Sequence, residues 1–188
     1  VDVARHHFTR VGDFWLSVNR LSHEKRIALQ VETFRNLPDE RLTIVGGHQV
    51  GVDARSFIRS LNPPANVEFL GEVDEARLVD LYATCRGFVA TSQDEDFGLT
   101  PVEAMASGKA VVAVDEGGYR ESVVPGTTGW LLPPTPDAFG TAIARVSPED
   151  LEAMREACEH RARDFDASRF VARMTELIHT VAKGGRGS

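Results

Sequence analysis

Two carboxylates, Glu95 and Glu103, are the residues of this sequence best placed for chemistry, because they flank a predicted turn from a strand into a helix. Both belong to the segment TSQDEDFGLTPVEAMASGKAVVA. Between them, Phe97-Gly98-Leu99 leads to the helix start, where the first backbone N–H groups lack partners and the helix dipole is positive. Such a helix start favours an anion, for example a diphosphate. The polar crowding from Gln93 to Asp96 favours a ligand that also carries hydroxyls or positive charge.

Glu103 also has a purely structural interpretation. Thr100, Pro101 and Glu103 fit the N-cap, first and third positions of a helix, which is a capping box with proline in its preferred place. In a capping box the carboxylate bonds to the backbone and needs no ligand. The residues alone therefore leave capping and ligand binding open for Glu103.

Two cations, Arg20 and Lys25, lie at the end of the first predicted strand, in the segment NRLSHEK. They straddle a predicted helix N-terminus, which the helix dipole makes unfavourable for cations. Their placement is easier to understand if an anion lies between them. The alternative is a pair of solvated surface cations that Glu24 partly offsets.

The glycine pairs Gly46-Gly47 and Gly117-Gly118 follow predicted strands and indicate turns in which the backbone approaches another group closely or adopts a positive φ. Neither pair forms G-x-G-x-x-G, and the sequence contains no G-x-x-x-x-G-K-[ST]. The histidines and the two cysteines, Cys85 and Cys158, match no metal-ligand spacing. We expect no metal site, and we expect both thiols to be reduced and partly buried.

The composition is that of a folded domain of ordinary size. A chain of 188 residues with 42% hydrophobic residues can bury a full core without disulfides. Its net charge of −7 argues against the basic face that nucleic-acid binding requires. No apolar run approaches the roughly 20 residues that cross a bilayer. Together with the reduced thiols, these features favour the cytoplasm.

Short apolar runs alternate with amphipathic stretches along most of the chain, which predicts an α/β fold with a doubly wound, Rossmann-like parallel sheet. Three further helical patterns follow between about 135 and 182, with start signals at Ser147-Pro148-Glu149 and Asp166-Ala167-Ser168. In such sheets ligands bind where strands end and turn into helices. The predicted strands are 14–19, 41–46, 66–71, 87–92, 109–114 and 128–134, and the intervening helices lie at about 24–37, 52–61, 74–85, 100–108 and 117–124.

Taken together, these segments resemble the C-terminal domain of retaining GT-B glycosyltransferases of the group 1 family, which includes many archaeal and bacterial mannosyltransferases. The resemblance runs from about Asp13 to Val181, through FWLSVNRLSHEKRIALQVETF, LTIVGG, NVEFLGEV, LVDLYATCRGFVATS, EDFGLTPVEAMASGKAVVAVDEGGYRESV and TGWLL. It implies one half of a GT-B fold. Residues 13–182 would form the nucleotide-sugar-binding domain, 1–12 a linker from a preceding domain, and 183–188 a flexible tail.

The resemblance also implies roles for the polar residues. Glu95, Arg20 and Lys25 would be catalytic: Glu95 would address hydroxyls of the transferred sugar, and the two cations would neutralise the departing diphosphate. Glu103 would accept hydrogen bonds from the ribose. The remaining donor-binding residues would offer the backbone of the helix start to sugar and phosphate, and they are Phe97, Gly98, Leu99 and Thr100.

The implied reaction is metal-independent transfer of a sugar from a nucleotide sugar, with GDP-mannose as the first expectation and no cofactor. The acceptor would be held by the protein's own N-terminal domain. That domain is expected to precede Val1, because the sequence lacks an initiator Met. This chain alone would then bind the donor without transferring its sugar. A peripheral membrane contact through that domain is expected if the acceptor is lipid-linked. Two alternatives stay open on the same fold: a nucleotide-sugar epimerase and a non-catalytic nucleotide-binding domain.

Two segments depart from the family's usual pattern. Gly47-His48-Gln49-Val50 replaces the frequent acidic-glycine-proline sequence after the second strand, and Asn19 replaces a frequent glycine before Arg20. The first departure leaves the contacts of that loop unassigned.

Overall fold

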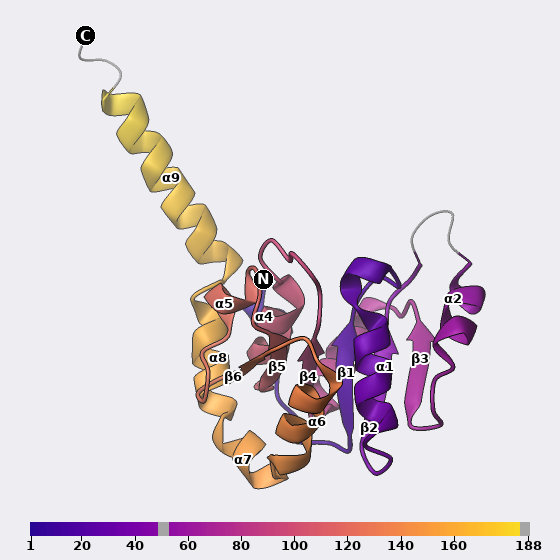
Figure 1. Ribbon diagram of the computed structural model, residues 1–188. Helices are drawn as coiled ribbons and strands as arrows, with labels where there is room; N and C mark the ends of the chain where they lie inside the picture. The colour runs from indigo at the N-terminus through magenta and orange to yellow at the C-terminus, as the bar shows by residue number, and fades with distance from the viewer. Residues whose placement is uncertain (49–52, 185–188) are drawn as a thin grey trace.

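The computed structural model describes residues 1–48 and 53–184. Six strands of this part of the chain form one sheet in the order β3-β2-β1-β4-β5-β6, and neighbouring strands pair in parallel (Figure 1). This is the strand order of a Rossmann sheet, so the predicted fold class is confirmed. The strands are β1 Phe14–Val18, β2 Arg41–Val45, β3 Val67–Gly71, β4 Gly87–Ala90, β5 Val111–Val114 and β6 Gly129–Leu132.

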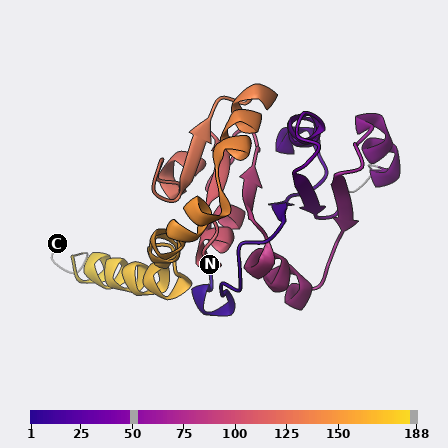
Figure 2. The same ribbon diagram turned by 90° about the horizontal axis from the view of Figure 1, so that it is seen from below.

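Helices cover both faces of the sheet, which explains why its central strands read as continuous apolar runs. β4 and β5 are buried along their whole length. Figure 2 shows α1, α2 and α6 on one face and α3, α4 and α8 on the other. The helices before β6 are α1 Ile27–Arg35, α2 Ala54–Leu61, α3 Glu75–Thr84, α4 Leu99–Ala106 and α5 Tyr119–Ser122, with the short 3-10 helices η1 Val3–Arg5 and η2 His23–Lys25.

The centre of the sheet is the place where its strand order reverses. β1 pairs with β2 on one side and with β4 on the other, so the chain builds outward from the centre in both directions. The turns that follow β1 and β4 therefore leave the same edge of the sheet side by side, with a crevice between them. These two turns contain Arg20, Lys25 and Glu95.

The C-terminal region contains four helices where the sequence predicted three: α6 Pro136–Arg145, α7 Pro148–Ala153, α8 Arg155–Arg163 and α9 Ala167–Gly184. The extra boundary lies at Met154, between α7 and α8. Both predicted start signals are confirmed, since Ser147 caps α7 in a capping box and Asp166 accepts a hydrogen bond from the Ser168 backbone N–H at 2.8 Å. Helix α9 extends to Gly184, two residues into the predicted tail, and 185–188 lie outside the described residues.

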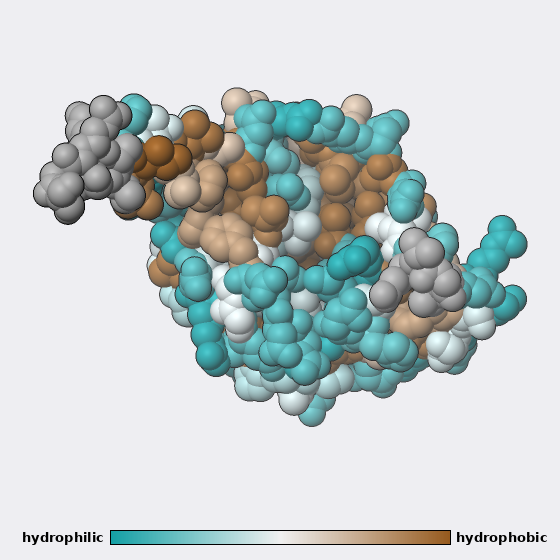
Figure 3. All heavy atoms as spheres, turned by 90° about the horizontal axis from the view of Figure 1, so that it is seen from above, coloured by the Kyte–Doolittle hydropathy of each residue, from teal (hydrophilic) through white to brown (hydrophobic). Residues whose placement is uncertain are grey.

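Helix α9 projects from the body (Figure 1). It exposes apolar side chains. Figure 3 shows them as part of an apolar area that continues onto the adjoining body. Within residues 1–48 and 53–184, no helix is both long and apolar enough to cross a membrane. The large exposed side chains of α9 are Phe170, Val171, Met174, Leu177 and Ile178.

The segment 1–12 lies along the body. The Thr9 N–H donates to the Ala83 carbonyl at 3.1 Å, and the Gly12 N–H donates to the Cys85 carbonyl at 3.2 Å. Lys109, which is 1% exposed, donates from Nζ to the Arg10 carbonyl and lies 4.2 Å from the centre of the Phe8 ring. A buried cation thus fastens this segment, whose role as a linker stays a prediction.

Burial lowers the pKa of Lys109 to about 8, from a model-peptide value of 10.5. Because the unfolded chain then binds one more proton than the folded chain between these values, stability should rise with pH across this window. We expect the free energy of unfolding to gain about 2 kcal/mol from this group between pH 7 and pH 10. Lys109→Met should lack this rise, and urea unfolding of both proteins across the window checks it. Parallel pH profiles for the two proteins would contradict it.

Candidate functional site

A cleft of about 550 Å³ opens where the turns after β1 and β4 leave the sheet. Seven of the eight residues predicted to act on the donor line it, and Glu103 is the exception among them. The predicted residues in the lining are Arg20, Lys25, Glu95, Phe97, Gly98, Leu99 and Thr100; Val18, Asn19, Gly46, Gly47 and Asp96 complete it.

The turn after β1 is held by its backbone. The Leu21 N–H donates to the Gly47 carbonyl at 2.8 Å, which ties this turn to the end of β2. A Cβ added to Gly46 would lie 1.8 Å from the Asn19 carbonyl oxygen, and Gly46 has φ +139°. The predicted close approach at Gly46-Gly47 is therefore confirmed, and only glycine fits this contact. Of the unassigned loop segment, Gln49 and Val50 lie outside the described residues.

The two turns are joined across the cleft. The Gln93 N–H donates to the Glu24 carbonyl at 2.7 Å, and the Thr91 hydroxyl donates to the Lys25 carbonyl at 2.8 Å. Lys25 is the last residue of the 3-10 helix η2, and Arg20 precedes that helix. Because α1 begins only at Ile27, both cations lie before the α-helix, and the prediction that they straddle its N-terminus is wrong.

Lys25 forms an ion pair with Glu95, with Nζ 2.8 Å from Oε2. Both side chains are mostly buried, with 19% and 24% of their surfaces exposed. Arg20 is exposed at the rim of the same cleft. The structure thus brings together a carboxylate and two cations from opposite sides of the crevice, as the sequence predicted.

A second ion pair joins Arg26 and Glu116, with Nη1 2.8 Å from Oε2. Sequence patterns did not indicate it. It links the start of α1 to the turn after β5. Arg26 has a left-handed backbone, with φ 47°. The sequence around Glu116 contains no sign of a partner 90 residues away.

The turn after β4 takes its shape from the second glycine pair. The Gly118 N–H donates to the Glu95 carbonyl at 2.8 Å. A Cβ on Gly117 would lie 2.5 Å from that carbonyl oxygen, and one on Gly118 would lie 2.5 Å from Cα of Phe97. Gly117-Gly118 therefore holds the loop that presents Glu95, which confirms the predicted close approach.

The predicted capping box at Thr100 is wrong. Helix α4 begins at Leu99, and its N-cap is Gly98, with a left-handed backbone at φ 77° and no side-chain cap. Thr100 and Pro101 are therefore the second and third helical residues, and Glu103 is the fifth. The glycine lets the helix start two residues earlier than an N-cap threonine at position 100 would. Leu99 and Thr100, the first two residues of the helix, line the cleft, and no capping side chain competes for their N–H groups.

Glu103 lies one helical turn beyond the cleft lining. Its Oε2 accepts a hydrogen bond from the Tyr82 hydroxyl at 2.9 Å. Burial raises the pKa of this carboxyl group, and the Tyr82 hydrogen bond acts in the opposite direction. Tyr82 was predicted only as part of an amphipathic helix, because a helix period places a residue on the core face without indicating what its hydroxyl contacts.

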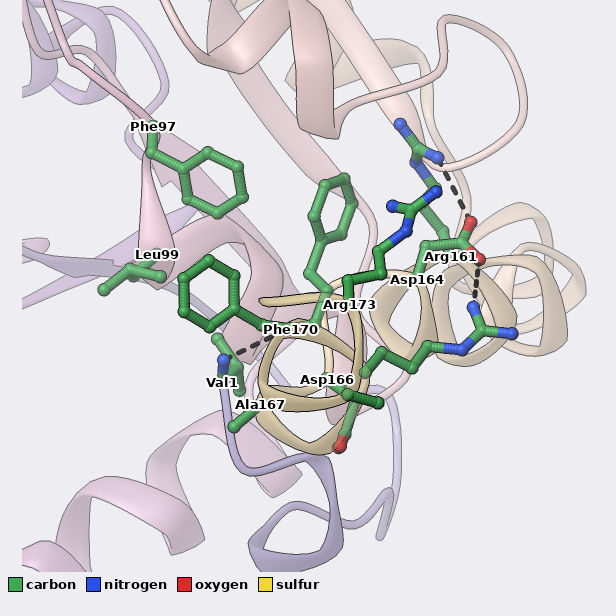
Figure 4. A pocket seen from close by; sticks show the side chains of 12 residues that line it. Val1, Phe97, Leu99, Arg161, Asp164, Asp166, Ala167, Phe170 and Arg173 are labelled. Atoms are coloured by element: carbon green, nitrogen blue, oxygen red, sulfur yellow. Dashed lines mark hydrogen bonds and ion pairs between the residues drawn. The ribbon is translucent and has the colours of Figure 1, made fainter. Parts of the chain in front are cut away.

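A larger groove of about 1010 Å³ adjoins the cleft and shares Phe97 and Leu99 with it. Figure 4 shows these side chains facing Phe170 and Ala167 of α9, with Val1 at the base. Two arginines on this side, Arg161 and Arg169, are paired with Asp164. The smaller cleft, by contrast, contains the predicted acid and both predicted cations.

Cys85 and Cys158 are free and fully buried, so the thiols are reduced as predicted but more deeply buried. Across the described ranges, no cluster of three or more His, Cys, Asp or Glu side chains is arranged to hold a metal ion.

The glycine contact predicts a clear pair of mutational effects. Gly118→Ala should destabilise the protein by about 1–3 kcal/mol, because the new methyl group would overlap the backbone of Phe97. Gly140→Ala, in the middle of α6 with no atom near the added Cβ, should stabilise it by about 0.5–1 kcal/mol. Urea unfolding of both variants tests this, and the same direction of change in both would contradict it.

Comparison with known proteins finds sequence relatives among mannosyltransferases. The chain is 29% identical to an α-1,3/1,6-mannosyltransferase of Neurospora crassa, covering 90% of this chain and 44% of that protein. It is 42% identical to a GDP-mannose-dependent α-mannosyltransferase of Mycolicibacterium smegmatis, covering 61% of this chain and 29% of that protein. The chain thus spans less than half the length of these relatives.

Solved structures share the fold. A sucrose-phosphate synthase from Thermosynechococcus elongatus superposes with a TM-score of 0.87 at 23% identity, covering 98% of this chain and 51% of that one. The Anabaena protein HepE, solved with UDP and glucose, gives a TM-score of 0.84 at 22% identity, covering 95% of this chain and 55% of that one. The model of the family "Glycosyl transferases group 1" matches residues 9–165. This chain belongs to the group 1 glycosyltransferase family.

Proposed function

We propose that this chain is the donor-binding half of a retaining glycosyltransferase, which takes a sugar from a nucleotide sugar without a metal ion. The observation that carries the proposal is the meeting of Arg20, Lys25 and Glu95 with the uncapped start of α4 in one cleft. Cations and a helix start bind a diphosphate, while a carboxylate binds hydroxyls. A nucleotide sugar carries both groups.

The charges suit the departure of a nucleoside diphosphate. Breaking the bond between sugar and diphosphate develops negative charge on the departing oxygens. Fixed cations and backbone N–H groups stabilise that charge as it forms. Lys25, paired with Glu95 in this structure, could then contact both the diphosphate and the sugar-binding carboxylate without moving far. In this proposal Glu95 accepts hydrogen bonds from the sugar and Glu103 from the ribose.

GDP-mannose is the donor we propose first. The support comes from sequence relatives, which include mannosyltransferases and one named as GDP-mannose-dependent. HepE was solved with UDP and glucose, so UDP-sugars are the natural comparison in a binding screen.

The acceptor would bind to another part of the protein. The proposed partner is an N-terminal domain joined through residues 1–12, with the reaction in the cleft between the two halves, where positioning and exclusion of water raise the rate. If the acceptor is lipid-linked, that domain would also contact the membrane. Two unpaired thiols, Cys85 and Cys158, support the reducing cytoplasm as the location.

The first test is binding without metal. We expect calorimetry in excess chelator to show binding of GDP or UDP, because the cleft offers cations and N–H groups to the phosphates. Affinity should be unchanged when Mg²⁺ or Mn²⁺ is added. Binding that disappears with chelator and returns with either ion would contradict the metal-free mechanism, and no binding of either nucleotide would contradict the function.

The second test separates phosphate contacts from base contacts. Arg20→Ala and Lys25→Ala should each weaken binding of the nucleoside diphosphate by roughly tenfold, about 1.4 kcal/mol, and leave binding of the nucleoside nearly unchanged. Arg41→Ala is the matched control, because Arg41 pairs with Asp13 at the opposite end of the sheet. If Arg41→Ala had the same effect, general surface charge would explain the binding.

A further inference from the structure

The hydroxyl of Tyr82 connects the core of the domain to Glu103. Tyr82 is on α3, its side chain is fully buried, and its hydroxyl donates to Glu103 Oε2 at 2.9 Å. Its ring contacts Phe88 of β4, at 5.8 Å between ring centres, and the edge of the His6 ring at 5.7 Å. A ring fixed on both sides has little freedom to rotate, so the direction of its hydroxyl is fixed too.

The Tyr82 hydroxyl is the main polar partner of the Glu103 carboxylate. Glu103 is half-buried, yet among the described residues no lysine, arginine or histidine forms an ion pair with it. A carboxylate in such a place needs hydrogen-bond donors. In the same part of the chain, Tyr82 supplies the one donor recorded, and it goes to Oε2. Oε1 is left as an acceptor for another group.

We propose that Tyr82 is a positioning residue for the nucleotide site. By holding Oε2, it orients Glu103 so that Oε1 accepts a hydrogen bond from a ribose hydroxyl of the bound nucleotide. This inference rests on the proposed function, in which Glu103 contacts the ribose. The alternative is that Glu103 merely satisfies a buried tyrosine, in which case removing the hydroxyl would leave nucleotide binding unchanged.

His6 extends the arrangement to the segment 1–12. Its ring lies edge-on to Tyr82, and its Nδ1 is 3.3 Å from the Ser107 hydroxyl, just after α4. The segment therefore contacts the tyrosine ring in addition to β4. In this way the orientation of Glu103 depends on residues far from the cleft.

The experiment compares wild type with Tyr82→Phe, which keeps the ring and removes only the hydroxyl. The ligands are GDP or UDP, whichever the wild type binds, and inorganic pyrophosphate, which has phosphates but no ribose. We expect Tyr82→Phe to weaken nucleoside diphosphate binding by about 3- to 10-fold and pyrophosphate binding by less than twofold, because the hydroxyl supports only the ribose contact.

The pH dependence of nucleotide binding gives a second readout. Protonation of Glu103 removes a charged acceptor, so its contribution is lost as pH falls through its pKa. Because the Tyr82 hydrogen bond lowers that pKa, Tyr82→Phe should move the loss to a higher pH. The other groups that face Glu103 are Tyr82 itself, whose pKa is raised well above 10, and the Val1 ammonium group. His6, whose pKa burial lowers, contacts the Tyr82 ring. Because His6 and the terminal phosphate of the nucleotide titrate with both proteins, the difference between the wild-type and Tyr82→Phe profiles between pH 4.5 and pH 7 reports on the carboxylate.

Glu103→Gln completes the comparison, because its amide oxygen can still accept from Tyr82 but does not titrate. In the Glu103→Gln background, adding Tyr82→Phe should weaken binding by less than in the wild type, and the change of pH dependence should disappear. Equal weakening of GDP and pyrophosphate by Tyr82→Phe, or no weakening of either, would overturn the positioning role while leaving the proposed function intact. A wild type that binds pyrophosphate but neither GDP nor UDP would overturn both.

Discussion

The pairing of β1 with β4 at the centre of the sheet is the constraint on which the cleft depends. Trp15 and Leu16 of β1 face Gly87 and Phe88 of β4 in parallel register, and the Ser17 hydroxyl donates to the Val89 carbonyl at 2.9 Å. A Cβ on Gly87 would lie 2.6 Å from the Trp15 ring, so glycine lets the tryptophan pack directly on the neighbouring strand. This pairing places the two site-bearing turns side by side and so determines where the cleft lies.

Electrostatic balance is the second principle of the cleft. The chain carries a net charge of −7, yet its candidate anion site is built from local cations and an uncapped helix start. Glu95 compensates the charge of Lys25 within the cleft, and the Arg26–Glu116 pair joins the start of α1 to the turn after β5. Paired charges that are partly buried remain oriented, so a ligand meets groups whose conformational freedom is already reduced.

Local patterns predicted the parts of the structure that local forces determine. Strand and helix alternation, the Ser147 start and the close approaches at both glycine pairs follow from nearby residues. The start of α4 was not predicted correctly from local patterns. Gly98 in a left-handed conformation and Thr100 are both acceptable N-cap residues, and the structure uses Gly98. The Tyr82–Glu103 and Arg26–Glu116 contacts could not be predicted, since they join helices and turns whose relative positions depend on the whole sheet.

The Gly117-Gly118 turn has a consequence for how the cleft can vary. Gly117 and Gly118 hold the Glu95 loop because they have no side chain. The backbone of the loop occupies the space that a Cβ atom would need at either position. Substitution at these two positions would be poorly tolerated although neither residue has functional groups to lose. Mutational sensitivity would therefore extend beyond the chemically active residues to a neighbouring turn. If the cleft has the proposed function, variation in donor preference would have to arise in the side chains that line it, because the backbone of the loop has no space to move.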